Sequence, residues 1–328
     1  MTELPPATKL AILLTARWAV NDAKPLTNTE FLQFRRWLGT DTEAALSVIT
    51  GEATLTECPL DTVRLKALLE RGLGLFQPLD RWLQAGLWVR AWSDAEYPPR
   101  FKRLRVRAPA LLFGCGSPEA FTELALAIVG SRNASEERLA DAEAIGAACA
   151  RDSVAVVSGG ARGVDTGVMS ACVDAGGSAV GVLADSLLKE SGNRAYRRAI
   201  MESRLSLMSE VHPEARFEVG NAMSRNRLIH LCADATLLVE CEVGKGGTWQ
   251  GAMEALKESR TVYVLRGAKA EAQLVELGAI TVDMDMATQP KKLITEKQPP
   301  NEIHRLLQHA KPATKNLSLF DSVESGLE

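Results

Sequence analysis

The 328-residue sequence has no long hydrophobic run, no Cys-x-x-Cys pair and no excess of basic residues. Near its start the longest apolar stretch covers residues 10–14 and is followed by Arg17, far short of the ~20 residues that a membrane span needs. No cleavage-site pattern of a secretory signal follows this stretch. The six cysteines, without a close pair, favour a reducing compartment. We therefore expect a cytoplasmic protein that does not enter the membrane.

The sequence also has few of the residues from which catalytic or metal centres are built. Its four histidines are scattered, and His304 and His309 lie five positions apart, which puts them on different faces of a helix. Neither a Ser/His/Asp nor a Cys/His arrangement is recognisable. We therefore expect no catalytic residue, no metal and no cofactor. Since the net charge is −3, any binding of nucleic acid requires a local basic patch.

What is present divides the chain into three parts. Residues 1–91 contain short apolar-periodic segments broken by proline and glycine, which predict a small helical domain. Residues 92–116 are rich in turn residues and form a connector to a core that ends at residue 284. Residues 285–328 are rich in lysine and proline, and we expect a linker and flexible tail there, with one short helix over 301–310 and no winged-helix domain.

The core, residues 92–284, contains short apolar runs separated by helical stretches. Continuous apolar runs are typical of strands buried on both faces, as in a parallel sheet covered by helices. Between the first two runs, Ser135 followed by Glu136 and Glu137 predicts the start of a helix. The chain is therefore predicted to be an α/β protein with a mostly parallel sheet and flanking helices. The runs cover residues 124–130, 154–159, 178–183, 205–210, 235–240 and 261–267.

Polar and glycine-rich segments follow four of these runs, at residues 130–132, 158–165, 223–229 and 244–248. Parallel sheets bind ligands at the carboxyl ends of their strands, where loops and helix N-termini expose backbone N–H groups. Glycines there would let the backbone approach an anion, and arginines would form two-pronged contacts with phosphate. The last segment lacks the residue order of a P-loop and does not predict ATP hydrolysis. These segments predict a pocket for phosphate groups.

Simpler structural interpretations of the same residues remain open. The glycines of the first two segments would make tight strand-to-helix turns, with Asp165 capping a helix. Arg225 and Arg227, expected at the opening of a helix, would form a solvated charge pair instead of holding a strand of phosphates. The basic segment 100–107 would either follow a DNA backbone or form a solvated, alternating edge strand.

Taken together, the segments resemble the pattern of one known family. GSR (130–132), SGGARGVD (158–165), SRNRLI (224–229) and GGT (246–248) are similar to the GSR, SGxAxGID, FxxRNRxI and GSxxT motifs of the DNA-processing protein A (DprA/Smf) family. The upstream segment AEYPPRFKRLRVRAPALLFGCG (95–116) resembles the YPxxL…PPxxLFxxG lead-in of that family. Because these elements occur in the family's order over residues 92–267, the chain resembles a divergent member.

The resemblance implies an extended Rossmann-like fold, a helical N-terminal domain, a homodimer, and a pocket for the phosphates of single-stranded DNA that is handed to a RecA-type recombinase. Lys245 is added to the candidate site on its charge alone. The candidate DNA-binding or phosphate-binding residues are Gly130, Ser131, Arg132, Ser158, Gly159, Gly160, Arg162, Gly163, Arg225, Asn226, Arg227, Lys245, Gly246, Gly247 and Thr248.

Two departures from the family pattern leave the biological setting open. The histidine that usually follows the GID motif is absent, because Asp165 is followed by residues Thr-Gly-Val-Met. The usual turn after the third strand is replaced by residues 184–188, Ala-Asp-Ser-Leu-Leu. A role in natural transformation and a role in mobile-element biology or phage defence are both compatible with this sequence.

Two other functions use the same pocket. One is a phosphoribohydrolase of the lysine-decarboxylase-like (LOG) group, whose glycine-rich motifs are echoed at residues 159–169 and 246–254. Those enzymes need an acid two or three residues after the threonine, whereas the first acid after Thr248 is Glu254. The other is a module that senses a small nucleotide.

The tail contains a separate motif. Residues 316–321, Asn-Leu-Ser-Leu-Phe-Asp, are similar to the QLSLF-type peptides with which bacterial DNA enzymes dock on the sliding clamp. Leu317, Leu319 and Phe320 would be the anchors, and a flexible tether would let them reach a groove on the clamp.

Overall fold

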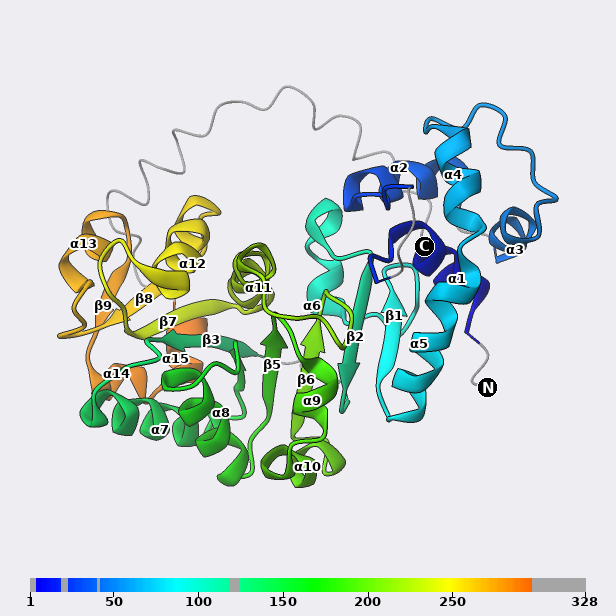
Figure 1. Cartoon of the computed structure of the whole chain (residues 1–328). Helices are drawn as coiled ribbons and strands as arrows, with labels where there is room; N and C mark the ends of the chain where they lie inside the picture. The colour runs from blue at the N-terminus through cyan, green and yellow to red at the C-terminus, as the bar shows by residue number, and fades with distance from the viewer. Residues whose placement is uncertain (1–3, 19–22, 40–41, 118–123, 297–328) are drawn as a thin grey trace.

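The computed structural model describes residues 4–18, 23–39, 42–117 and 124–296. They form a nine-stranded sheet with helices on both faces and a further group of helices beside β1 (Figure 1). The strand order is β1-β2-β6-β5-β4-β3-β7-β8-β9. The strands are β1 Trp88–Ala91, β2 Leu111–Cys115, β3 Ala125–Gly130, β4 Ala155–Ser158, β5 Ala179–Leu183, β6 Leu205–Ser209, β7 Ala235–Glu240, β8 Val262–Leu265 and β9 Ile280–Val282.

All six predicted runs are strands, β3 to β8, and adjacent members pair in parallel. The prediction of an α/β protein with a mostly parallel sheet is thus confirmed. β3 lies between β4 and β7, so successive strands are added on one side of β3 up to β6 and on its other side from β7 onward. In sheets of this kind the ligand crevice lies at the carboxyl ends of the strands beside such a switch point.

Three strands were not predicted. β1 and β2 pair antiparallel with one another, β2 pairs antiparallel with β6, and β9 pairs parallel with β8. β1 lies in the range predicted as a helical domain and β2 in the predicted connector, so the sheet begins at Trp88, before residue 92. β1 has only four residues with alternating burial, and turn residues surround β2, which explains why neither is recognisable as a buried run.

The N-terminal helices cover one end of the sheet (Figure 1). α2 starts with a capping box, in which the Thr27 side chain accepts from the Glu30 N–H and the Glu30 carboxylate accepts from the Thr27 N–H. Leu10 and Phe31 belong to the same core cluster as Phe113 of β2. These helices are α1 Pro6–Thr15, α2 Asn28–Leu38, α3 Thr42–Thr50, α4 Thr62–Leu69 and α5 Gly72–Gln84.

Two core clusters lie on the two faces of the sheet. In β3, Leu126 and Ile128 belong to one cluster and Ala127 and Val129 to the other, because successive side chains of a strand point to opposite faces. α7 begins as predicted, with the Ser135 hydroxyl accepting from the N–H of residue 138. The remaining α-helices of the core are α6 Pro99–Lys102, α7 Glu136–Arg151, α8 Val164–Asp174, α9 Leu187–Ser191, α10 Arg194–Met201, α11 Val219–Cys232, α12 Gly246–Lys257, α13 Glu271–Glu276, α14 Met284–Ala287 and α15 Pro290–Thr295.

The basic segment 100–107 is helical. It forms the end of α6 and the 3₁₀ turn η1 (Arg105–Arg107), so the expectation of an alternating edge strand is wrong. Near the end of the core, α14 and α15 lie beyond residue 284, where a linker was expected. Leu293 of α15 is buried and its carbonyl accepts from the Tyr263 hydroxyl at 2.8 Å, which ties this helix to β8.

Within the described ranges no helix is both long and apolar enough to cross a bilayer. The six thiols are free, and all except that of Cys58 belong to buried residues. The motif at residues 316–321, with Leu317, Leu319 and Phe320, lies outside the described residues, as does the helix expected over 301–310.

Candidate functional site

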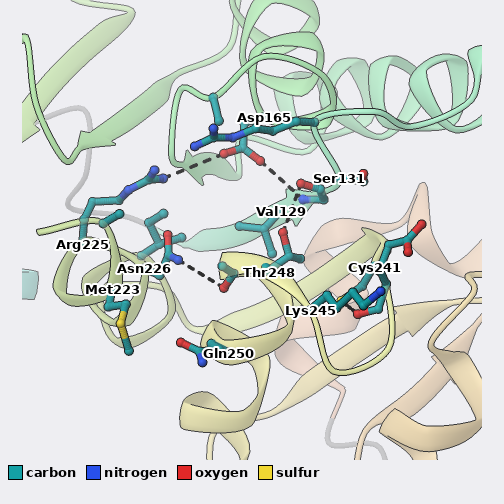
Figure 2. A pocket seen from close by; sticks show the side chains of 18 of the residues that line it. Val129, Ser131, Asp165, Met223, Arg225, Asn226, Cys241, Lys245, Thr248 and Gln250 are labelled. Atoms are coloured by element: carbon teal, nitrogen blue, oxygen red, sulfur yellow. Dashed lines mark hydrogen bonds and ion pairs between the residues drawn. The ribbon is translucent and has the colours of Figure 1, made fainter. Parts of the chain in front are cut away.

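A cavity of about 590 Å³ lies at the carboxyl ends of β3 and β7, where the switch point predicts a ligand site (Figure 2). Its walls come from the loops after these two strands and from α11 and α12. Nine of the fifteen candidate residues line it: Gly130, Ser131, Arg132, Arg225, Asn226, Lys245, Gly246, Gly247 and Thr248.

The N-terminus of α12 forms one wall of the cavity. Lys245 is its N-cap residue, with extended backbone and no side-chain cap hydrogen bond, so the first N–H groups of the helix lack a capping side chain. Gly246 has a φ of +78°, a conformation that favours glycine. Uncapped N–H groups and the positive end of the helix dipole together favour an anion at this position.

Two polar side chains hold this helix end in place (Figure 2). The Thr248 hydroxyl donates to the Gly130 carbonyl at 3.2 Å, and the Asn226 amide donates to the Gly247 carbonyl at 3.1 Å. Both donors are therefore engaged within the protein. The contribution of this wall to an anion comes from backbone N–H groups and from the exposed Lys245.

A buried ion pair forms the opposite wall. Arg225 Nη1 lies 4.0 Å from Asp165 Oδ2, and both residues are at most 7% exposed. The Asp165 carboxylate also accepts from the backbone N–H groups of Gly130 at 3.4 Å and Gly159 at 3.1 Å. Burial raises the pKa of Asp165 and lowers the pKa of Arg225, and each charge opposes the shift of the other. The pair is thus a fixed element that joins α8 to α11.

The glycines after β3 and β4 serve packing. A Cβ on Gly130 would lie 2.6 Å from the Val164 side chain, and one on Gly163 would lie 2.6 Å from the Ser131 carbonyl. A Cβ on Gly159 would lie 1.5 Å from the Arg225 guanidinium. For these three residues the geometry favours the structural interpretation over close approach to an anion.

Ser158, Gly159, Gly160, Arg162 and Gly163 are not part of the cavity wall. Ser158 is fully buried and its hydroxyl donates to the Ile128 carbonyl at 2.6 Å, so it joins two strands. Arg162 is exposed and donates to the Asn133 side chain at 3.1 Å.

Arg227 faces a different environment from Arg225. The sequence pattern predicts both arginines at the opening of a helix. The helix that carries them begins at Val219, so they lie in its middle. Side chains that are two positions apart in a helix point to nearly opposite faces. Arg227 lies near the carboxylate of Glu210, whose pKa is raised by burial and lowered by a Ser224 hydrogen bond and by Arg227. Arg225 lines the cavity and Arg227 does not, so the structure does not bring the two arginines together.

Several residues of the cavity were not predicted. Phe217, Val219 and Met223 line it and are 55%, 67% and 41% exposed. They give the cavity exposed apolar side chains. Phe217 and Val219 are isolated residues in the sequence, and Met223 opens the segment 223–229 without having been a candidate itself. His230 lies at the base, where Thr236 Oγ1 is 3.1 Å from Nδ1 and where burial lowers the pKa of the imidazole to about 4.

The exposed charges around the mouth are mainly positive. Arg132 and Lys245 are exposed, whereas the carboxylate of Glu242 is paired with Lys269 at 2.7 Å. Among the described residues no group of three or more potential metal-binding side chains is present. The arrangement therefore suits an anion held by backbone N–H groups and cations, with an apolar group lying against Phe217.

The strand order and the position of the cavity define an extended Rossmann-like protein with a cavity at its switch point. A sequence profile of the DNA recombination-mediator protein A family matches residues 88–294, and the chain belongs to this family. Protein Smf of Escherichia coli K12 is 28% identical over 214 residues, which are 63% of this chain and 56% of Smf. The chain spans about half the length of the curated relatives it matches.

Two solved structures have the same fold. DNA processing protein A from Streptococcus pneumoniae superposes with a TM-score of 0.64 at 21% identity, covering 91% of this chain and all of that one. DNA processing protein A from Helicobacter pylori, a protein that binds single-stranded DNA, superposes with a TM-score of 0.52 at 21% identity. That alignment covers 62% of this chain and 94% of the other.

Proposed function

We propose that this protein binds single-stranded DNA by its phosphates, without catalysis, and acts as a mediator of DNA recombination. The observation that carries the proposal is the lining of the cavity, which combines the uncapped N-terminus of α12 and two exposed cations with exposed apolar side chains. Single-stranded nucleic acid needs both parts, a positive surface for the backbone and apolar platforms for bases. Family membership and the single-stranded DNA binding of the Helicobacter pylori protein support it.

In this proposal each side of the cavity has its own task. A phosphate lies against the first N–H groups of α12 and between Arg132 and Lys245. Bases lie against Phe217 and Met223. The Asp165–Arg225 pair does not contact DNA directly but fixes the wall on which the strand rests.

An enzymatic function has weaker support from the same residues. Glu254, the acid that a phosphoribohydrolase-like site would use, is not among the residues that line the cavity. Asp165 lines it, but both of its oxygens accept hydrogen bonds from the backbone. A general acid or base must reach the reacting atoms. The cavity therefore favours binding over hydrolysis.

The test is a titration of the purified protein with fluorescent oligo-dT and with nucleoside monophosphates at two salt concentrations. Oligonucleotide binding should weaken strongly with salt and should be reduced in Arg132→Gln/Lys245→Gln. Arg197→Gln/Arg198→Gln, which removes two exposed charges on α10, is the matched control and should bind as the wild type does. Release of ribose phosphate, or tight monophosphate binding without oligonucleotide binding, contradicts the proposal.

The remaining partners belong to the same proposal. We infer that the cytoplasmic protein forms a homodimer, transfers DNA to a RecA-type recombinase and contacts the sliding clamp through Leu317, Leu319 and Phe320. Either natural transformation or mobile-element and defence biology is its setting. Deletion of residues 316–321 tests the clamp contact, since unchanged clamp affinity in the deletion variant would exclude it.

A further inference from the structure

A second cavity, of about 210 Å³, lies at the other end of α11. Residues of α11 from Val219 to His230 line the first cavity. The second cavity is bordered by the last two residues of α11, by the loop after α12 and by the segment from α6 to η1. Four arginines line it: Arg100, Arg103, Arg107 and Arg260. Three of them belong to the basic segment 100–107, which has no part in the function proposed above.

Two of the arginines support the local structure. Arg100 is 5% exposed, and its two terminal nitrogens donate hydrogen bonds to the Asp234 carboxylate at 3.1 and 2.8 Å. Arg260 donates to the carbonyl of Ala233 just beyond the end of α11. These contacts hold the guanidinium groups in place at the floor of the cavity.

The other two arginines are more accessible. Arg107 pairs with Glu258, and this ion pair is more than a third exposed on both sides. The guanidinium of Arg103 is exposed and makes no hydrogen bond or ion pair with the described part of the chain. In addition, Nε of Arg260 is buried without a hydrogen-bond partner among the described residues.

The cavity therefore has more positive than negative charge. Four guanidinium groups face two carboxylates, those of Asp234 and Glu258. Burial lowers the pKa of Arg260, Asp234 and Cys232 raise it in part, and the nearby Arg100 and Arg107 lower it again. An anion in the cavity would relieve this repulsion and would satisfy the free donors.

We propose that this second cavity binds a phosphodiester group of the same DNA strand that enters the first cavity. The inference rests on the proposed function. A volume of about 210 Å³ is below the roughly 300–1,000 Å³ of sites for whole small molecules, which suits one phosphate better than a nucleotide. The exposed side chains of Lys102 and Arg105 continue the positive surface outside the cavity, as expected where a backbone passes.

The geometry of α11 sets the length of DNA that both cavities require. Met223 borders the first cavity and Cys232 the second, and nine residues of helix span about 14 Å at ~1.5 Å per residue. A strand of a few nucleotides bridges this distance. Short oligonucleotides would fill the first cavity alone, and longer ones would reach both.

The experiment compares a thymidine dinucleotide, which is too short to span this distance, with oligo-dT of roughly 16 nucleotides, by fluorescence anisotropy over a salt series. The variant is Arg103→Gln/Arg107→Gln, which leaves the buried Arg100 and Arg260 intact. The matched control is Arg197→Gln/Arg198→Gln. It likewise removes one exposed arginine that has no ion pair with the described residues, and one exposed ion pair, Arg198 with Glu202. Circular dichroism melting establishes that each variant folds.

We expect the variant to bind the long oligonucleotide about tenfold more weakly than wild type or control do, which corresponds to about 1.4 kcal/mol. The slope of log affinity against log salt should fall by about 0.7 for each lost phosphate contact. The short oligonucleotide should bind all three proteins equally. If Arg132→Gln/Lys245→Gln weakens long-oligonucleotide binding and the second-cavity variant does not, the second site is refuted while the proposed function stands. Absence of oligonucleotide binding in the wild type refutes both.

Discussion

The guanidinium of Arg225 lies directly against the backbone of Gly159, where a Cβ would come within 1.5 Å of Nη1. The absent side chain thus creates the space in which a buried arginine reaches Asp165. Gly159 follows β4 and Arg225 lies in α11, so this contact connects two elements that are far apart in the sequence.

Replacing Gly159 with alanine should displace Arg225. We expect Gly159→Ala to lower the free energy of unfolding by about 1–3 kcal/mol, as overpacking of a buried site does. It should also weaken oligonucleotide binding, because the wall of the cavity moves. Urea unfolding and anisotropy measure the two effects. Gly167→Ala in α8, where a Cβ meets its nearest neighbour at 3.9 Å, is the control, and an equal loss in both variants would contradict the prediction.

Arg227 should matter for stability and not for DNA binding in the first cavity. In Arg227→Ala, Glu210 loses a nearby positive charge, and we expect a loss of roughly 1–3 kcal/mol of unfolding free energy at neutral pH. Burial already raises the pKa of Glu210, so the loss should shrink as pH falls and this carboxylate becomes protonated.

The matched test of the Arg227 prediction is the addition of Glu210→Gln, which should restore most of the lost stability. Oligonucleotide affinity should stay within about twofold of wild type, less than 0.5 kcal/mol. A large loss of oligonucleotide affinity in a stably folded Arg227→Ala variant would contradict the prediction and would indicate that Arg227 contacts phosphate.

His230 should make the protein sensitive to acid. Burial, with Arg225 and Arg260 nearby, lowers the pKa of His230 from 6.5 to about 4. The unfolded chain therefore binds a proton there below about pH 6.5, whereas the folded chain does so only near pH 4. Stability should be complete above pH 6.5 and should fall by up to about 3 kcal/mol toward pH 4.

The histidine contribution is measured as the difference in pH dependence between wild type and His230→Asn. Asparagine retains a polar partner for Thr236 but does not titrate. The variant will be less stable overall, yet its unfolding free energy should vary less between pH 6.5 and 4. An identical slope in both proteins would show that His230 is not the titrating group.

Phe217 should contribute to base contacts without contributing charge. Phe217→Ala should weaken oligonucleotide binding by about 1–3 kcal/mol, the usual contribution of one stacked base, with no change in the salt slope. Binding of an abasic strand should be the same in variant and wild type. Met201→Ala removes another exposed apolar side chain, 76% exposed and on α10, and serves as the control.

The sequence predicted the parallel core because its strands are buried on both faces and read as continuous apolar runs. The run at 235–240 coincides with β7, and the run at 205–210 differs from β6 by one residue. β1 and β9, with four and three residues, are too short to show a period. The order of strands depends on long-range packing that no local pattern encodes.

The sequence placed nine of its fifteen candidate residues in the wall of the cavity, and their part in binding stays a prediction. The motif at residues 244–248 contributes four residues to the wall of the cavity, and its glycines and lysine are exposed. The motifs after the strands could not separate Arg225 from Arg227, since that required the true start of α11 at Val219. Nor could they distinguish Ser131, which lines the cavity, from Ser158, whose hydroxyl donates a hydrogen bond to the carbonyl of Ile128 in the neighbouring strand.

The sheet ends in two short strands, β1 with four residues and β9 with three. An edge strand has unpaired backbone N–H and C=O groups that can form hydrogen bonds with an extended segment of another chain. The length of the edge strand limits the number of these hydrogen bonds. Here both edges offer very few. Strand-by-strand growth between copies of this protein is therefore disfavoured, which protects a wide sheet from aggregation.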